Sequence, residues 1–494
     1  MKIRRQVQGA AFAALGAIGV WAQSGPADPL SYSIPTPKPI SPAEGTTTPS
    51  AQAAQRQNPF LGSVPSMDTG TKLELSLQNA ISRGLHYNLG LVEESHSSAD
   101  VRTERLRALS TLLPQIAGNA RQAYEDLSYK EIGLKLPPLL GLPALLPTSG
   151  GFGYQDARIS LTQTVFSQEL RERYRARKIE EGASALSVED AREVVVLAVG
   201  TAYFQVVASS ARVETAKAQL ATAREFDQLA AHRVGSEVAP EIDALRAQVE
   251  RQSAEQRLTN VMNQLEKDRL TFGRITGLAI GQAFELADKP AAAAPAFTVE
   301  SALENALRAR ADLASAEATV HAAERTLQAA KAQRLPLASI NADFGLGGVN
   351  LANSNGVYSI AGNISVPLYT GGRIAADIAQ AQSDLERRRA EYADLKGRIA
   401  YDVRVAWLDA NASGSSVKVA ESSAELAERA LEQSRDRYEN GVTNSVEVVE
   451  AQQAVAAAHE NTIHSLYSLN VALISLARAM GGAETRLPLL LGRK

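Results

Sequence analysis

The 494-residue sequence contains no cysteine. Disulfide bonds, thiolate metal sites, a cysteine nucleophile and a lipid anchor attached through cysteine are therefore all excluded. Aromatic residues make up only 5% of the chain, a proportion more typical of long packed helices than of a compact mixed core. The 51 basic and 54 acidic residues nearly cancel, so no excess of either charge indicates a nucleic-acid partner.

The residue sets that support enzyme chemistry are missing as well. The six histidines do not form a metal-ligand set, because His459 and His464, on one predicted helix, are five residues apart. We find no catalytic triad and no nucleotide-binding loop in the sequence. The sequence therefore predicts that the protein is not an enzyme and that it needs no cofactor and no metal.

The sequence contains a long internal repeat. Its second half matches its first half at a nearly constant offset of 204 residues. The matched landmarks are Ala202-Tyr203 with Ala406-Trp407, Asp243 with Glu447, Ala247-Gln248 with Ala451-Gln452, and Gly277 with Gly481. A repeat of this length indicates a duplicated supersecondary module and not a short solenoid unit.

The N-terminus has the pattern of an exported protein. A basic start precedes an apolar stretch at 10–20 and small residues that suit signal-peptidase cleavage. Nine of the 20 prolines follow in a segment whose composition cannot bury a core. The predicted organisation is a signal peptide at 1–22, a Pro-rich flexible linker at 23–66, repeat 1 at 67–280, an inter-repeat linker at 281–296, repeat 2 at 297–482 and a C-terminal tail at 483–494.

Each repeat is predicted to contain the same elements in the same order. Helical stretches of moderate length come first, at 73–112 and 299–334, and each ends at a Leu-Pro step. Segments in which apolar and polar residues alternate then predict strands at 116–124, 158–162, 339–344 and 358–366. Proline-free helical stretches at 171–233 and 373–438 lead through short turns into return helices that end near 275 and 480. The return helix of repeat 2 has leucines at coiled-coil spacing.

Four strands per chain cannot form a closed barrel alone. A sheet that spans a membrane must close, and closed barrels need about eight strands or more. The simplest solution is a cyclic trimer that pools its strands. The predicted fold is an α+β membrane protein, mainly α, in which a trimeric 12-stranded β-barrel with four strands per chain continues into a long α-helical coiled-coil barrel built from two internal repeats.

Two motifs of the sequence resemble those of the TolC-type outer-membrane efflux proteins. The letters VPLYTGG stand at 366–372, where a predicted strand meets a helix, and RYENGVTNSVEVVEAQ stands at 437–452, across the turn of a long hairpin. The resemblance covers nearly all of the chain beyond the linker. It implies a homotrimer whose β-barrel is integral to the outer membrane and whose helices extend into the periplasm.

The resemblance also implies a function and partners. The protein would be the passive exit duct of a tripartite efflux pump for small molecules, with a periplasmic adaptor protein and an inner-membrane transporter that supplies the energy. Two alternatives stay open at this point: the outer-membrane duct of a type I protein secretion system, and a soluble periplasmic coiled-coil scaffold.

The resemblance places candidate residues at the periplasmic entrance of the duct. Glu447 and Glu450, three apart on one helix face, and their repeat-1 counterpart Asp243 are predicted there. Because Arg246 can offset Asp243, the uncompensated charge is expected in repeat 2, where it would attract cations. The alternative is that both glutamates only solvate an exposed helix face.

The turns of the two long hairpins are the predicted docking points for the adaptor. The residues concerned are Arg233, Gly235, Arg437, Tyr438 and Gly441. For Arg437 and Tyr438, packing against the neighbouring hairpin is the alternative. Glu237 stands where repeat 2 has Gly441, so a different turn geometry is expected in repeat 1. An apolar insertion at 133–150 is predicted to be a surface loop.

Overall fold

The structure is a computed structural model that describes residues 58–67, 72–128, 149–288, 290–291 and 297–491. The chain divides into two units, residues 1–51 and 52–494, and every described residue belongs to the second. The predicted signal peptide, most of the predicted linker and nearly all of the insertion at 133–150 lie outside the described residues.

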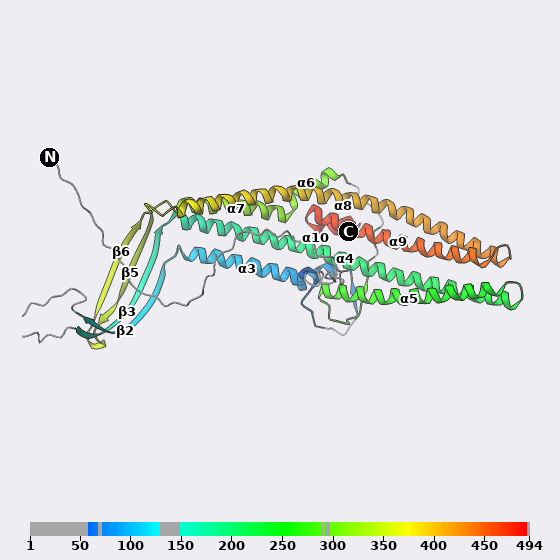
Figure 1. The fold of residues 1–494 in the computed structure, drawn as a ribbon, viewed down its shortest axis with the longest axis horizontal. Coiled ribbons are helices and arrows are strands. Elements are labelled where there is room, and N and C mark those ends of the chain that lie inside the picture. The colour runs from blue at the N-terminus through cyan, green and yellow to red at the C-terminus, as the bar shows by residue number, and fades with distance from the viewer. Residues whose placement is uncertain (1–57, 68–71, 129–148, 289, 292–296, 492–494) are drawn as a thin grey trace, which may run out of the picture. The chain divides into compact units, whose positions relative to one another are not determined.

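The two repeats contain matching elements (Figure 1). The first part of the chain forms η1 (Pro59–Leu61), β1 (Leu73–Leu75), α2 (Leu77–Tyr87), α3 (Leu89–Ser110), β2 (Gln115–Ser128), β3 (Ser149–Phe166), α4 (Gln168–Gly235), α5 (Glu241–Thr276) and β4 (Phe284–Leu286). The second part forms α6 (Val299–Ala309), α7 (Ala311–Ala332), β5 (Leu337–Gly348), η2 (Leu351–Asn353), β6 (Ser354–Ser365), α8 (Arg373–Glu439), α9 (Ser445–Met480) and α10 (Ala483–Leu490). The predicted strand hairpins and long helical hairpins are confirmed.

The predicted helical stretches at 73–112 and 299–334 differ from the structure in detail. Each is two helices, which join at Asn88 and Arg310, where the backbone is extended. The Asn88 side chain accepts a hydrogen bond from the Gly90 N–H at 3.0 Å and so begins the second helix, as an N-cap residue does. Residues 73–75 are a strand, because they pair in parallel with β4, more than 200 residues later. Local sequence patterns cannot reveal such a long-range pairing.

A four-stranded antiparallel sheet follows the order β2-β3-β5-β6 and has two chemically different faces. Large apolar side chains that are exposed to solvent gather on one face: Ile116, Tyr124, Ile159, Ile340, Phe344, Leu346, Tyr358, Ile360 and Ile364. The register places Ile159, Phe344 and Tyr358 side by side in one row of this face. The opposite face presents mainly Ser, Thr, Asn and charged residues. An exposed apolar face of this extent indicates a surface that contacts lipid or protein.

The long helices form contiguous series (Figure 1). Beside the sheet, α3 contacts α4, α4 contacts α7, and α7 contacts α8. Beyond this region, α5 contacts α4, α4 contacts α9, and α9 contacts α8. The helices α4 and α8 thus take part in both series, and the sheet and the hairpin turns lie at opposite ends of them.

The main core lies where α4 and α8 pass from one series to the other and α9 packs against both. The predicted seam is confirmed, because Leu469, Leu473 and Leu476 are fully buried. At Gly200 the α4 backbone approaches α9 so closely that a Cβ atom would lie 2.8 Å from Cδ1 of Ile474. One stretch of 18 residues in α4 is apolar enough to cross a membrane, but half of it is buried in the protein. Its apolar character is therefore explained at least in part by core packing.

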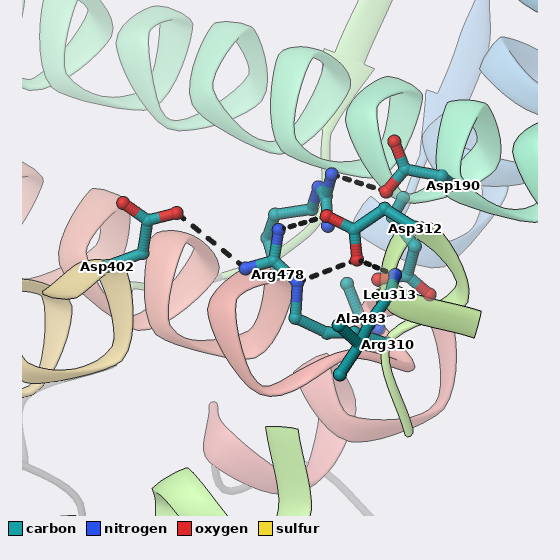
Figure 2. A network of polar contacts seen from close by, with 8 residues as sticks. Asp190, Arg310, Asp312, Leu313, Asp402, Arg478 and Ala483 are labelled. Carbon is teal, nitrogen blue, oxygen red and sulfur yellow. Dashed lines mark hydrogen bonds and ion pairs between the residues drawn. The ribbon is translucent and has the colours of Figure 1, made fainter. Parts of the chain in front are cut away.

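A group of largely part-buried charges lies beside this core and includes an ion pair between the two repeats (Figure 2). Arg478 of α9 lies 2.5 Å from Asp190 of α4. Arg310, at the joint of α6 and α7, binds Asp312 through two hydrogen bonds of 2.6 and 2.9 Å and lies 3.7 Å from Asp402 of α8. Burial raises the pKa of Asp190, although Arg478 opposes this effect. Arg478 therefore links α9 to α4, and Arg310 links the joint of α6 and α7 to α8.

We predict that Arg478→Gln destabilises the protein by about 1–2 kcal/mol at neutral pH, because it leaves the part-buried Asp190 without its cation. Burial raises the pKa of Asp190, and without Arg478 protonation of this carboxyl removes the unpaired charge, so the loss should be smaller at an acidic pH than at neutral pH. Urea unfolding at both pH values, followed by the fluorescence of Trp407, measures the effect. Trp407 is a suitable probe because it is partly buried and donates a hydrogen bond to the Phe297 carbonyl.

The control for this prediction is Arg398→Gln. Arg398 forms an exposed pair with Asp394 within α8, and its loss should change stability by less than about 0.5 kcal/mol at either pH. An equal effect of both substitutions would contradict a stabilising role for the pair of Arg478 and Asp190.

Candidate functional site

The turns of the two long helical hairpins have the same backbone geometry. In repeat 2, Gly441 has a φ of 72°, and the Val442 N–H donates to the Arg437 carbonyl at 2.8 Å. In repeat 1, Glu237 has a φ of 60°, and the Val238 N–H donates to the Arg233 carbonyl at 2.9 Å. Both are helix ends of the Schellman type. The expectation that Glu237 changes the turn geometry is therefore wrong, because the glutamate adopts the left-handed conformation that glycine prefers.

Arg233 joins the two turns to each other. Its Nη1 donates to the carbonyl oxygens of Tyr438 and Glu439, at 2.6 and 2.8 Å, and these carbonyls belong to the last turn of α8. Its guanidinium also lies over the Tyr438 ring, 4.8 Å from the ring centre. A cation at the C-terminal end of a helix stabilises the unpaired carbonyls there. Arg233, a residue of repeat 1, therefore caps the C-terminal end of α8 in repeat 2.

A small apolar cluster lies directly behind these turns. It consists of Phe226, Ala230, Ala247, Tyr438 and Val448, which come from α4, α5, α8 and α9. The rings of Phe226 and Tyr438 meet edge to face with their centres 5.4 Å apart. Tyr438 is only 1% exposed, so it is a packing residue in this structure. Its predicted contact with an adaptor is not available in this conformation.

Asp243 forms a second link between the hairpins. It is buried, and the Ser445 hydroxyl donates to its Oδ1 at 2.6 Å from the start of α9. Arg246 lies 3.7 Å from the same oxygen. Burial, followed by the nearby Asp243 carboxylate, raises the pKa of the Tyr438 hydroxyl, which Arg233 opposes. Asp243 is thus engaged inside the protein rather than free at its surface.

The two glutamates of repeat 2 are in different environments. Glu447 is half-buried, lies 3.3 Å from Nε of Arg437 through its Oε1, and accepts a hydrogen bond from the Thr443 hydroxyl. Glu450 is exposed. The expectation that the charge of repeat 2 is uncompensated therefore needs correction for Glu447, because Arg437 is close enough to offset it.

The structure brings most of the predicted residues together. Arg233, Tyr438 and Asp243 meet between the hairpins, while Gly235, Arg437 and Gly441 lie exposed at the turns. Their predicted roles in docking and at an entrance stay predictions. The sequence analysis did not identify Phe226 and Ser445 as partners of these residues. Phe226 of repeat 1 contacts Tyr438 of repeat 2, and Ser445 of repeat 2 contacts Asp243 of repeat 1. No local pattern in the sequence links residues so far apart.

Comparison with known proteins places the repeats in a family. The family described as "Outer membrane efflux protein" matches residues 91–278 and 302–482. These ranges cover most of the chain, and they correspond to the two repeats.

Individual relatives are similar at low sequence identity. The pyoverdine export outer membrane protein OpmQ of Pseudomonas aeruginosa is 25% identical over 296 residues, which cover 58% of this chain and 60% of OpmQ. The outer membrane protein TolC of Escherichia coli is 22% identical over 413 residues, which cover 76% of this chain and 81% of TolC. The match therefore spans less than two thirds of OpmQ but most of TolC.

Solved structures share the fold. The Campylobacter jejuni CmeC outer membrane channel superimposes with a TM-score of 0.72 at 17% identity, over 86% of this chain and 92% of CmeC. The open state of the Neisseria gonorrhoeae MtrE outer membrane channel superimposes with a TM-score of 0.67 at 19% identity, over 85% of this chain and 95% of MtrE. At these identities the likeness establishes the fold, and it confirms the predicted combination of strand hairpins and long helices.

The matching turns provide a direct test of backbone strain. We predict that Glu237→Gly raises the free energy of unfolding by about 1 kcal/mol, because glycine adopts a positive φ without a steric cost. Gly441→Ala should lower it by about the same amount for the same reason. Thermal unfolding followed by far-UV circular dichroism measures both changes.

A helical glycine serves as the control. Gly182 lies within α4, and a Cβ atom there would meet open space, so Gly182→Ala should stabilise the protein. If Gly441→Ala behaved like Gly182→Ala, the turn would not depend on the left-handed conformation.

Proposed function

Because the chain belongs to the outer membrane efflux protein family, we propose that three copies assemble into the exit duct of a tripartite efflux pump. A member of this family is a channel of the outer membrane and not an enzyme. The proposal adds the trimer, the residues at its entrance, the partners and the class of cargo. The observation that supports it most is the open sheet with one exposed apolar face.

The sheet has two outermost strands, β2 and β6. In lipid, the unpaired N–H and C=O groups of such edges would each cost several kcal/mol. If β6 of one copy pairs with β2 of the next, the antiparallel alternation of the sheet continues without a break. Three copies of four strands give 12, within the range of closed membrane barrels. The apolar face would then contact lipid, and the polar face would line the lumen.

The helices have outer edges that match this arrangement. In the series that ends at the turns, α5 and α8 are outermost. The exposed face of α8 includes Tyr401, Leu408, Val419 and Leu426, whose spacings of 7, 11 and 7 keep them on one side of the helix. Such a stripe requires a helical neighbour, and α5 of the next copy is the neighbour that a closed ring supplies. The same ring that closes the sheet therefore closes the helices into a tube.

The hairpin turns would form the periplasmic entrance of this tube. Glu450 is exposed, and Glu447 is partly offset by Arg437. Three copies of Glu450 would place negative charge around a narrow opening and attract cations. Asp243 would contribute indirectly, by holding α9 to α5 through Ser445.

The partners would follow from this geometry. A periplasmic adaptor protein would bind the exposed turn residues Gly235, Arg437 and Gly441, and an inner-membrane transporter would supply the energy. The cargo would be small molecules, as the name of the relative OpmQ indicates for pyoverdine. Export through the predicted signal peptide at 1–22 would deliver the chain to the periplasm.

The experiment that tests the proposal is single-channel recording of the detergent-purified protein in a planar bilayer. We expect a cation-selective channel from protein that migrates as a trimer before heating. Glu450→Ala should account for most of the loss of selectivity seen in Glu447→Ala/Glu450→Ala, because Arg437 already offsets Glu447.

Glu304→Ala is the matched control, since Glu304 is an exposed glutamate of α6 that pairs with Arg308. It should leave the selectivity unchanged. A channel whose cation selectivity is unchanged by Glu450→Ala and by the double substitution would refute the entrance role of these glutamates, but it would still support the duct. A folded trimer that never conducts, even after the entrance pair is replaced, would refute the duct itself.

A further inference from the structure

A pocket lies between the two long helical hairpins. Its volume is about 490 Å³, and residues of α4, α5, α8 and α9 from the same chain line it. Small and apolar side chains form part of the lining: Ala218, Ala223, Ala254, Leu431 and Val455. Because three of these are alanines, the helices leave a space that larger side chains would fill. We call this space the interhairpin pocket, and its volume suits a small molecule.

Gln452 lines the pocket from a core position of α9. It follows Val448 by four residues and precedes Val455 by three, so the three side chains share one face of the helix. All three are buried, and Gln452 is only 9% exposed. An apolar residue is expected at such a position. The amide of Gln452 therefore needs a physical explanation.

The amide of Gln452 has no hydrogen-bond partner within the described part of the chain. Its Oε1 and Nε2 are both buried and unpaired, and an unpaired buried amide lowers stability. The counterpart in repeat 1, Gln248, is exposed, because α5 is outermost in its series whereas α9 packs between α4 and α8. The glutamine is thus buried without a partner only in the repeat where it borders a pocket.

Charged side chains of the lining are engaged with other residues. Nε2 of His459 lies 3.0 Å from Oε1 of Glu428, which joins α9 to α8. Nη1 of Arg257 donates to Oε1 of Gln219 at 3.1 Å, which joins α5 to α4. The free donor and acceptor of Gln452 are therefore the groups that a ligand can satisfy.

We infer that the interhairpin pocket binds a small uncharged molecule that has an apolar body and a primary carboxamide. A carboxamide accepts from Nε2 of Gln452 and donates to its Oε1, so the two amides pair through two hydrogen bonds. The apolar body lies against the alanines, Leu431 and Val455. Glu250 and Arg257 contribute opposite charges from α5, which favours a neutral ligand. All of these residues belong to one chain, so binding does not require the proposed trimer.

Three related compounds test the chemistry of the pocket. Naphthalene-2-carboxamide is the probe, and calorimetric titration of the detergent-purified full chain should show saturable binding. In 2-acetylnaphthalene a methyl group replaces the amide nitrogen, so nothing donates to Oε1 of Gln452 and the affinity should be about fivefold lower. Naphthalene-2-carboxylate should bind more weakly still, because a buried charge without a partner is costly.

Substitution of Gln452 tests the residue itself. Gln452→Leu removes both hydrogen bonds and should weaken binding of the carboxamide by about tenfold, with no preference left over 2-acetylnaphthalene. It should also raise the melting temperature of the ligand-free protein, because no unpaired amide stays buried. A purely structural glutamine would give the opposite change in melting temperature.

Two further variants separate loss of the site from loss of the fold. Gln248→Leu is the matched control, since Gln248 is the exposed counterpart in repeat 1, and it should leave the affinity at the wild-type value. Ala218→Trp keeps Gln452 but fills part of the pocket from an exposed position of the lining. This variant should weaken binding of all three compounds.

The outcomes are distinct from those of the conductance experiment. Saturable binding of the carboxamide that is weakened by Gln452→Leu, but not by Gln248→Leu, supports the site. Folded wild-type protein that does not bind the carboxamide, or binds it as tightly after Gln452→Leu, overturns the assignment. Tighter binding of the carboxylate also overturns it, and would indicate an anion site at Arg257. None of these results depends on whether the protein conducts, so the proposed duct is tested separately.

Discussion

The sheet β2-β3-β5-β6 imposes the constraint on which the rest of this protein depends. It exposes nine large apolar side chains on one face and ends in two strands that have no further partner in the described chain. An apolar face favours lipid, but backbone groups at an open edge cannot be left unpaired there. The two demands are met together only when the edges of separate copies pair. In the proposed trimer, the outer helices α5 and α8 then meet as a consequence of the same closure.

Duplication supplies two similar hairpins, and their differences are concentrated where the hairpins touch. Arg233 of repeat 1 binds the carbonyls at the end of α8, whereas its counterpart Arg437 lies beside Glu447. Asp243 is buried against Ser445, while its counterpart Glu447 is half-exposed. The two turns nevertheless keep one backbone geometry. At these two pairs of positions, the repeat-1 residue makes an internal contact and its repeat-2 counterpart lies nearer the surface.

Charge serves different purposes along the length of the protein. Beside the core, Arg478 holds α9 of repeat 2 to α4 of repeat 1, and Arg310 holds helices of repeat 2 together (Figure 2). On the polar face of the sheet, Arg158 joins two strands and stays close to the wall. At the turns, Glu450 is exposed and is the side chain best placed to act on passing ions in the proposed duct. Burial decides which of these charges must be paired.

The sequence by itself determined the duplication, the four strands, the long helical hairpins and the positions of their turns, because each depends on a period or a breaker within a short window. It could not reveal the pairing of β1 with β4, since this depends on residues more than 200 positions apart in the chain. The helix breaks at Asn88 and Arg310 were missed, although Asn88 is an N-cap residue of a kind that a local pattern can indicate. It named Arg233, Tyr438 and Asp243, but only the tertiary structure decided that they bind across the repeats. Alternation in the strands predicted polar positions at Arg158 and Asp343, yet only the register showed that these two residues lie close enough to form an ion pair. Side-chain partners are decided by three-dimensional packing, and a local pattern contains no information about it.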